Sequence, residues 1–287
     1  MKSVLGIYSA PASHWVGDGF PVRTLFSYDR MGKQLSPFLL LDFAGPSEFT
    51  PTRTQRGVGG HPHRGFETVT IVYNGEVQHR DSAGNGGTIG PGDVQWMTAG
   101  AGVMHEEFHS EGFAKRGGRL QMAQLWVNLP AKDKMTSPQY QTILKDAIPE
   151  IALANKAGRV RVIAGDFAGV TGPARTFTEL NVWDLQMHAE ATCLLELPEG
   201  HNSILAVLQG RVQIGSGQHL GDADLAILSA TGKSAWLRAQ TDVTLLVLSG
   251  KPIEEPIVGY GPFVMNNRNE IITAFNDLEA GRFGELE

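Results

Sequence analysis

The sequence predicts an all-β protein that contains two similar barrels or sandwiches. Short runs rich in β-branched and aromatic residues, such as residues 67–73, recur along the chain and alternate with turn signals. The chain has 35 glycines among its 287 residues, which suits frequent tight turns. Strand patterns resume at Arg159 after a stretch of different character, so the two halves read as a degenerate repeat. This length is enough to bury two medium-sized cores.

Composition excludes several classes of protein. The formal net charge of −6 provides no basic surface for direct nucleic-acid binding. The single cysteine, Cys193, excludes an intramolecular disulfide framework and fits a reducing compartment. The first residues lack the long apolar core of a signal peptide, and no apolar run approaches the thickness of a bilayer. We therefore expect a cytoplasmic protein with no nucleic-acid or membrane partner.

One early strand and one later hairpin each carry a polar side chain, Asp42 and His79, whose surroundings the sequence must explain. Residues 38–43 form an apolar run that contains Asp42, and a buried carboxylate requires polar partners. The side chain of Asp42 either hydrogen-bonds within the barrel or faces a functional site. Further on, Asn74-Gly75 is a strong hairpin signal that should return the chain along residues 76–81. His79 lies on that return, where we expect an ordinary polar strand position rather than a pocket residue.

Two short motifs about forty residues apart predict a metal site. His61-Pro-His63 and His105-Glu-Glu107 each place two side chains at positions i and i+2, which share one face of a strand. Three imidazoles and one carboxylate, with no thiolate, suit Fe, Mn, Co, Ni, Cu or Zn rather than Ca or Mg. An octahedral metal with four protein ligands keeps two positions free, which favours a catalytic site over a closed structural one.

Four segments, in the same order along the chain, resemble the pirin family of the cupin superfamily. They are HPHRGFETV (61–69), PGDVQWMTAGAGVMHEE (91–107), QLWVNLP (124–130) and GPFVMN (261–266). The resemblance implies a bicupin, with two jelly-roll-type β-barrels, one iron site in the N-terminal barrel and no complete site in the C-terminal barrel. It also implies His61, His63, His105 and Glu107 as the metal ligands.

The choice of carboxylate ligand depends on this resemblance. Glu67 shares the strand parity of the first two histidines and occupies the position that carries a ligand in the broader cupin pattern, so parity alone cannot choose between Glu67 and Glu107. We keep Glu67 as a candidate for orienting a ligand. Gln124 matches a position that lines the metal pocket in pirins, although it could equally be an ordinary strand amide. His109 continues the parity of Glu107, and we expect it to be exposed or to lie behind the ligands.

We expect three regions: an N-terminal metal-binding barrel (1–130), a connecting segment (131–158) and a C-terminal barrel (159–287) without a metal. The connecting segment includes a run with helical character at residues 149–156. The C-terminal region should end in a helix that starts at Glu270 and is capped by Asn269. One apolar stripe on this helix would comprise Ile271, Ile272, Phe275 and Leu278.

The function favoured by the sequence is a metal-dependent dioxygenase. Some pirins have quercetin 2,3-dioxygenase activity, so the resemblance implies a flavonol-like substrate and O2 as the co-substrate. In this hypothesis the three histidines hold the metal, while Glu107 is both a ligand and a possible general base. We expect one divalent transition metal, Fe(II), with Mn, Co, Ni, Cu or Zn as alternatives.

The alternative is an iron-binding regulatory protein that senses redox state and acts through protein partners. The resemblance allows it, because the pirin family includes transcriptional cofactors. A third option is another cupin activity, such as isomerisation. An enzyme of the first kind consumes O2 with its substrate, a sensor changes its affinity for a partner with the oxidation state of iron, and an isomerase works without O2.

Overall fold

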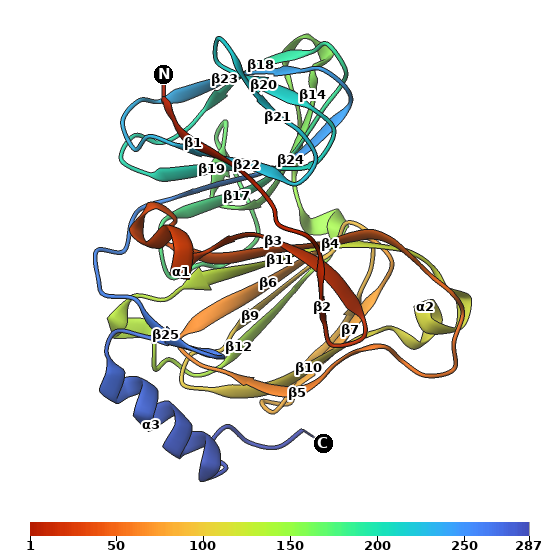
Figure 1. The fold of residues 1–287 in the computed structure, drawn as a ribbon, viewed down its shortest axis with the longest axis vertical. Helices are drawn as coiled ribbons and strands as arrows, with labels where there is room; N and C mark the ends of the chain where they lie inside the picture. Colours follow the sequence, from red (N-terminus) through yellow and green to blue (C-terminus); the bar gives the residue numbers. More distant parts are fainter. Residues whose placement is uncertain (287) are drawn as a thin grey trace. The chain divides into compact units, whose positions relative to one another are not determined.

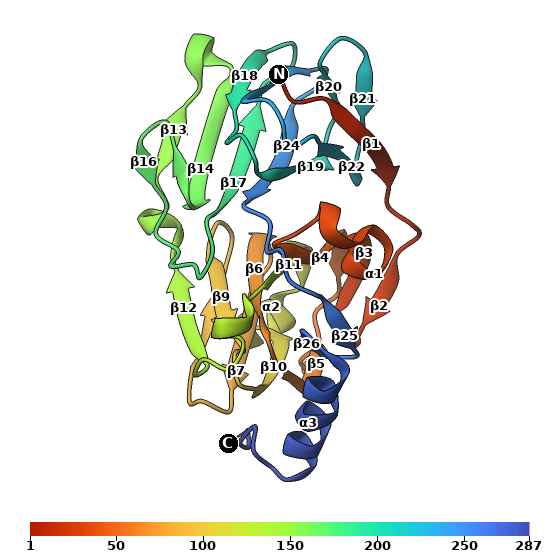
Figure 2. The same ribbon diagram turned by 90° about the vertical axis from the view of Figure 1, so that its left-hand side faces the viewer.

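The computed structural model describes residues 1–286, which group into two compact units. Unit 1 comprises residues 1–11, 25–38 and 146–252, and unit 2 comprises residues 12–24, 39–145 and the chain from 253 onward. Strands are the main regular structure of both units, as the sequence predicts (Figures 1 and 2). Strand pairs in both units, such as β6 (Phe66–Asn74) with β9 (Val94–Thr98) and β17 (Leu180–Met187) with β24 (Val243–Gly250), are antiparallel. The assignment of residues 1–130, 131–158 and 159–287 to three regions stays a prediction.

Unit 2 consists mainly of a seven-stranded sheet and a four-stranded sheet. In spatial order the larger sheet contains β12 (Gln139–Ile143), β9 (Val94–Thr98), β6 (Phe66–Asn74), β11 (Gly118–Asn128), β4 (Phe38–Phe49), β3 (Phe20–Ser27) and β2 (His14–Val16). The smaller sheet contains β5 (Gly57–His63), β10 (Val103–His109), β7 (Val77–Asp81) and β8 (Gly86–Ile89). Apolar side chains from both sheets, including Val72 of β6 and Val77 of β7, form one buried cluster. The two sheets of this unit therefore share a core.

The turn at Asn74-Gly75 does not form the expected hairpin. Gly75 has a positive φ of 87°, as the sequence suggests for a tight turn. However, β6 pairs with β9 and β11, whereas β7 pairs with β10 and β8. The turn thus carries the chain from the larger sheet to the smaller one, because β6 is already hydrogen-bonded on both edges.

Unit 1 repeats this architecture. Its larger sheet contains, in spatial order, β1 (Val4–Ser9), β22 (Asp224–Leu228), β19 (Asn202–Gln209), β24 (Val243–Gly250), β17 (Leu180–Met187), β14 (Gly158–Ala164) and β13 (Glu150–Ala152). Its smaller sheet contains β18 (Thr192–Glu196), β23 (Ser234–Ala239), β20 (Val212–Ile214) and β21 (Gln218–Leu220), and β15 (Asp166–Phe167) pairs with β16 (Val170–Thr171). Leu185 of β17 and Leu237 of β23 belong to one buried cluster, which lies between the two sheets.

The helices are short, apart from the last one. They are α1 (Tyr28–Met31), α2 (Glu111–Arg116), α3 (Arg268–Glu279) and the 3-10 helices η1 (Gly32–Gln34), η2 (Ala131–Asp133), η3 (Lys145–Ala147) and η4 (Ala154–Lys156). The run 149–156, expected to have helical character, contains β13 followed by the single turn η4. Within residues 1–286, the model contains no helix with the length and apolar character that a bilayer crossing requires.

The C-terminal helix begins earlier than the sequence suggests. Its N-cap is Asn267, whose side chain accepts a hydrogen bond from the backbone N–H of Glu270, so the expected cap at Asn269 is wrong. The apolar stripe is also only partly correct, because Ile271 is buried whereas Ile272 is 56% exposed. The helix follows a short ribbon of β25 (Val258–Tyr260) and β26 (Phe263–Met265), and Ile271 packs with Phe263 in a common cluster.

Candidate metal centre

Two paired strands of unit 2 bring three histidines together. On β5 and β10, His61 lies directly opposite His105, and His63 lies opposite Val103. One extra residue of β5, between His61 and Val58, forms a bulge in this pairing. The ring centroids are 4.9 Å apart for His61 and His63, 4.2 Å for His61 and His105, and 4.8 Å for His63 and His105. One potential ligand atom from each ring lies within 4.8 Å of the other two.

The hydrogen bonds of these rings leave one nitrogen of each for a metal. Nδ1 of His61 lies 2.9 Å from the carbonyl oxygen of Gly59, and Nδ1 of His63 lies 3.4 Å from that of Pro262. A ring that donates its Nδ1 proton presents the lone pair of Nε2. In His105, Nε2 is buried and has no hydrogen-bond partner. A buried polar atom without a partner is costly in the absence of a ligand, so the donor set fits a divalent transition metal.

Burial also keeps two of the imidazoles neutral. It lowers the pKa of His63 to about 3, reinforced by the neighbouring His61 and opposed by the contact with Pro262. Burial and the other histidines lower the pKa of His105 well below its ordinary value. Neutral imidazole is the form that binds metals, so these two side chains are ready to act as ligands at neutral pH.

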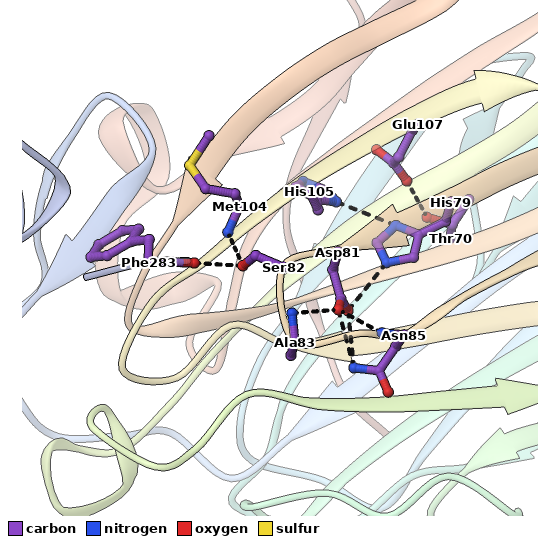
Figure 3. A network of polar contacts seen from close by, with 10 residues as sticks. All are labelled: Thr70, His79, Asp81, Ser82, Ala83, Asn85, Met104, His105, Glu107 and Phe283. Carbon is purple, nitrogen blue, oxygen red and sulfur yellow. Dashed lines mark hydrogen bonds and ion pairs between the residues drawn. The ribbon is translucent and has the colours of Figure 1, made fainter. Parts of the chain in front are cut away.

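Glu107 joins the cluster through His105 rather than through the His61-Pro-His63 motif. Within residues 1–286, a second group of potential ligands comprises His79, His105 and Glu107, again with their ligand atoms within 4.8 Å of one another. The four expected ligands therefore do not form one mutual cluster at this distance: the three histidines form one triad, and Glu107 belongs to a second triad with His79 and His105. Figure 3 shows Glu107 and His79 beside His105, on neighbouring strands of the smaller sheet.

Two side chains hold the carboxylate of Glu107. Gln124 on β11 donates a hydrogen bond from Nε2 to Oε2 over 2.9 Å, and Thr70 on β6 donates one from Oγ1 to Oε1 over 3.3 Å. Both partners come from the larger sheet, so Glu107 bridges the two sheets of this unit. Gln124 is thus in contact with an expected ligand, as its place in the pirin pattern suggests.

The other two candidate carboxylates lie outside both triads of the described residues. Glu67 is buried on β6 and accepts a hydrogen bond of 2.8 Å from Oγ1 of Thr98, while burial raises the pKa of Glu67 to about 7. Asp42 on β4 accepts a hydrogen bond of 2.6 Å from Oγ1 of Thr24. The first of the two arrangements left open for Asp42, a hydrogen bond within the barrel, is therefore present.

Two further histidines differ from the expectations. His109 is 1% exposed, and its Nε2 lies 2.9 Å from the carbonyl oxygen of Gly19, so it is neither exposed nor beside the cluster. His79, expected to be an ordinary polar position, is 2% exposed and lies against His105. A signal for this was present in the sequence: alternation along β7 places Val77, His79 and Asp81 on one face, with polar residues between them.

The segment after the His61-Pro-His63 motif is anchored by the C-terminal helix. Arg64 is buried and donates a hydrogen bond of 2.8 Å from Nη1 to Oδ2 of Asp277 on α3, and one of 2.7 Å from Nε to the carbonyl oxygen of Ala101. Its guanidinium lies 4.6 Å from the ring centre of Phe283. Ser82 donates a hydrogen bond to the carbonyl oxygen of Phe283 and accepts one from the backbone of Met104 (Figure 3).

Comparison with known proteins agrees with this architecture. The family model described as pirin matches residues 19–127, and the model described as the pirin C-terminal cupin domain matches residues 182–284. The chain belongs to the pirin family. A pirin-like protein of Solanum lycopersicum is 37% identical over 272 residues, covering 93% of this chain and 88% of the plant protein. The expected family and its two cupin domains are thus confirmed.

Two bacterial proteins are more similar to this chain than the plant protein is. A protein of Pseudomonas aeruginosa named "Putative quercetin 2,3-dioxygenase" is 56% identical over 283 residues, which cover 99% of both proteins. The crystal structure of a protein named quercetin 2,3-dioxygenase from Acinetobacter baumannii matches with a TM-score of 0.98 and 55% identity, and the match covers both chains completely.

Proposed function

We propose that this pirin is a metal-dependent dioxygenase that cleaves flavonols such as quercetin with O2. The observation that carries the proposal is the triad of His61, His63 and His105, in which the buried Nε2 of His105 has no protein partner. The names of the relatives at 55–56% identity support the substrate class. Open imidazole and carboxylate sites are used by oxygenases more often than by structural metal centres.

The residues that would hold the metal are the three histidines and Glu107, and we propose Fe(II) as the ion. His105 belongs to both triads, and to bind the same ion the Glu107 carboxylate would have to approach His61 and His63. When bound, such a metal supplies redox chemistry with dioxygen that amino-acid side chains lack. The side chains of the protein bind the flavonol, exclude water and accept the proton of the flavonol.

Glu107 is the proposed proton acceptor for the 3-hydroxyl group of the flavonol. Gln124 and Thr70 each hold one of its oxygens, at 2.9 and 3.3 Å. The longer bond is to Oε1, which makes Oε1 the oxygen more available to a proton from the substrate. Fixed orientation of a general base contributes to catalysis because the base must lie within hydrogen-bonding distance of the proton it accepts.

An aromatic wall next to the triad suits a planar substrate. The ring of His63 makes edge contacts with Phe66 at 5.0 Å and with Trp126 at 5.3 Å between centroids. Trp126 is partly exposed and lies two residues after Gln124 on β11, so both side chains are on the same face of this strand. We propose that Trp126 contacts the flavonol rings and thereby orients the 3-hydroxyl group toward Glu107.

Oxygen consumption by anaerobically prepared, Fe(II)-loaded protein with quercetin tests the proposal. We expect O2 uptake with loss of the flavonol absorbance in the wild type, none in His63→Ala, and unchanged uptake in His219→Ala, which alters an exposed histidine of unit 1. No uptake by the wild type with iron demonstrably bound would overturn the dioxygenase proposal. The redox-sensing alternative would then be examined by comparing partner capture by the Fe(II) and Fe(III) forms.

A further inference from the structure

We propose that His79 and Asp81 are positioning residues that fix the proton of His105 on Nδ1 and thereby present the lone pair of its Nε2 to the metal. The inference rests on the metal site of the proposed function and concerns side chains that the site motifs do not include. Figure 3 shows the three side chains in a row, with Asp81 and His79 on β7 and His105 on β10, the strand that carries Glu107.

Asp81 acts as an ionised hydrogen-bond acceptor. Its Oδ1 accepts hydrogen bonds from the backbone N–H groups of Ala83 at 2.9 Å and Asn85 at 3.0 Å, and the side-chain amide of Asn85 lies 3.2 Å from both carboxylate oxygens. Burial by itself would raise the pKa of Asp81, but the hydrogen bonds from His79 and Asn85 outweigh it and hold this pKa below its ordinary value. An ionised carboxylate can only accept hydrogen bonds.

The ionised Asp81 determines which nitrogen of His79 carries the proton. Its Nε2 lies 3.5 Å from Oδ2 of Asp81. Because the carboxylate is only an acceptor, the proton of a neutral His79 belongs on Nε2, and its Nδ1 carries a lone pair. This distance is at the long end of hydrogen bonding, so the bond itself is weak, and the assignment follows from the acceptor-only character of the carboxylate.

The lone pair on Nδ1 of His79 in turn determines which nitrogen of His105 carries its proton. Its Nδ1 lies 3.4 Å from Nδ1 of His79, and both rings are buried. If Nδ1 of His79 carries a lone pair, then Nδ1 of His105 must carry the proton, since the other tautomer would oppose two lone pairs. The remaining nitrogen, Nε2 of His105, is the buried atom that has no protein partner.

Strand pairing and packing hold the row in place. In the antiparallel pair of β7 and β10, Asp81 lies opposite His105 and His79 lies opposite Glu107. The ring of Tyr140 from β12 stacks on His79, with 5.0 Å between centroids and 13° between planes. His79 therefore has little freedom to turn away from His105. Partners of this kind behind a ligating histidine fix its tautomer, and their loss typically weakens metal binding 10–100-fold.

The direct test is ¹⁵N NMR of the imidazole nitrogens in the metal-free, full-length protein. We expect His105 protonated on Nδ1 with an unprotonated Nε2, and His79 protonated on Nε2. In His79→Phe, which keeps an aromatic ring next to Tyr140 but removes the acceptor, His105 should become a mixture of tautomers. A wild-type His105 protonated on Nε2, or the same single tautomer in His79→Phe, would overturn the inference.

The second measurement is the Kd for Ni(II), obtained by competition with a chelator. We expect it to rise about 10- to 100-fold in His79→Phe and in Asp81→Asn. The matched control is Arg80→Gln on the same strand, whose side chain is 55% exposed and pairs with Glu106. Unchanged affinity in folded His79→Phe would also overturn the inference. If only the dioxygenase proposal were wrong, quercetin turnover would be absent while the tautomers and the Ni(II) affinities were as stated. That outcome differs from a failure of the inference about His79 and Asp81.

Discussion

Gln124 and Glu107 come from different sheets of unit 2 and are joined by a 2.9 Å hydrogen bond between the amide Nε2 and the carboxylate Oε2. This bond fixes one oxygen of the only acidic side chain that belongs to a potential ligand triad within residues 1–286. In the proposed mechanism the same carboxylate accepts the proton of the substrate. The orientation of Glu107 therefore depends on a residue that belongs to neither potential ligand triad.

Gln124→Met should reduce quercetin turnover by the Fe(II)-loaded protein. Methionine has a similar volume but no amide, so Glu107 loses a hydrogen bond of the charge-assisted kind, which contributes about 1.5–3 kcal/mol. We expect kcat/KM to fall roughly 10- to 100-fold. The control is Gln121→Met on the same strand, where the side-chain oxygen accepts a bond from Asn74 instead. Equal activity of the two variants would contradict the role of Gln124.

Metal should stabilise the protein only when the triad is complete. A ligand at 100 times its Kd stabilises the folded state by about 2.7 kcal/mol, and 1 kcal/mol corresponds to roughly 2–4 °C in a chain of this size. We expect Ni(II) to raise the Tm of the metal-free wild type by several degrees, as measured by differential scanning calorimetry. His105→Ala should abolish this shift, whereas His219→Ala should retain it. A shift that persists in His105→Ala would place the metal elsewhere.

Glu67 should make the stability of the metal-free protein depend on pH. Its pKa is raised by burial from 4.5 to about 7, so the folded state binds this proton more tightly than the unfolded chain does. The stability that this proton contributes to the folded state is fully present below pH 4.5 and is lost as the pH rises through about 7. The free energy of unfolding of Glu67→Gln should equal that of the wild type near pH 4.5 and exceed it by roughly 3 kcal/mol at pH 8. Urea denaturation at both pH values measures this, and a difference that does not change with pH would refute it.

Arg161→Ala should destabilise unit 1 strongly. Nη1 of Arg161 donates a 3.1 Å hydrogen bond to Oδ2 of Asp184, whose side chain is completely buried. Removing the cation leaves a buried, uncompensated carboxylate, which costs about 3–5 kcal/mol. The matched control is Arg159→Ala on the same strand, because the pair of Arg159 with Glu150 is half exposed and contributes at most ~1 kcal/mol. Chemical denaturation measures the free energy of unfolding of both variants. A comparable loss of stability in the two would contradict this account.

Local sequence features predicted much of the site. The i, i+2 spacing of His61 and His63, repeated in His105 and Glu107, places each pair on one strand face without reference to the rest of the fold. The structure has these strands next to each other, with His61 opposite His105. The burial of His79 was missed because the polar residues Gln78 and Arg80 flank it, although alternation along β7 places them on the opposite face. Its contact with His105 depends on which strand lies next to β7.

The sequence by itself determined the strand-rich fold class and the repetition of one architecture in two halves, since these depend on periodicity and turn chemistry within a few residues. The two cupin domains were implied by the resemblance of four segments to the pirin family. Tertiary structure decided which strands pair. The turn at Asn74-Gly75 passes between sheets, and β1 at the N-terminus pairs with β22 more than two hundred residues later. Pairing over such separations is set by the hydrogen bonds and burial available at sheet edges, which no local pattern encodes. The same non-local register places His79 behind His105.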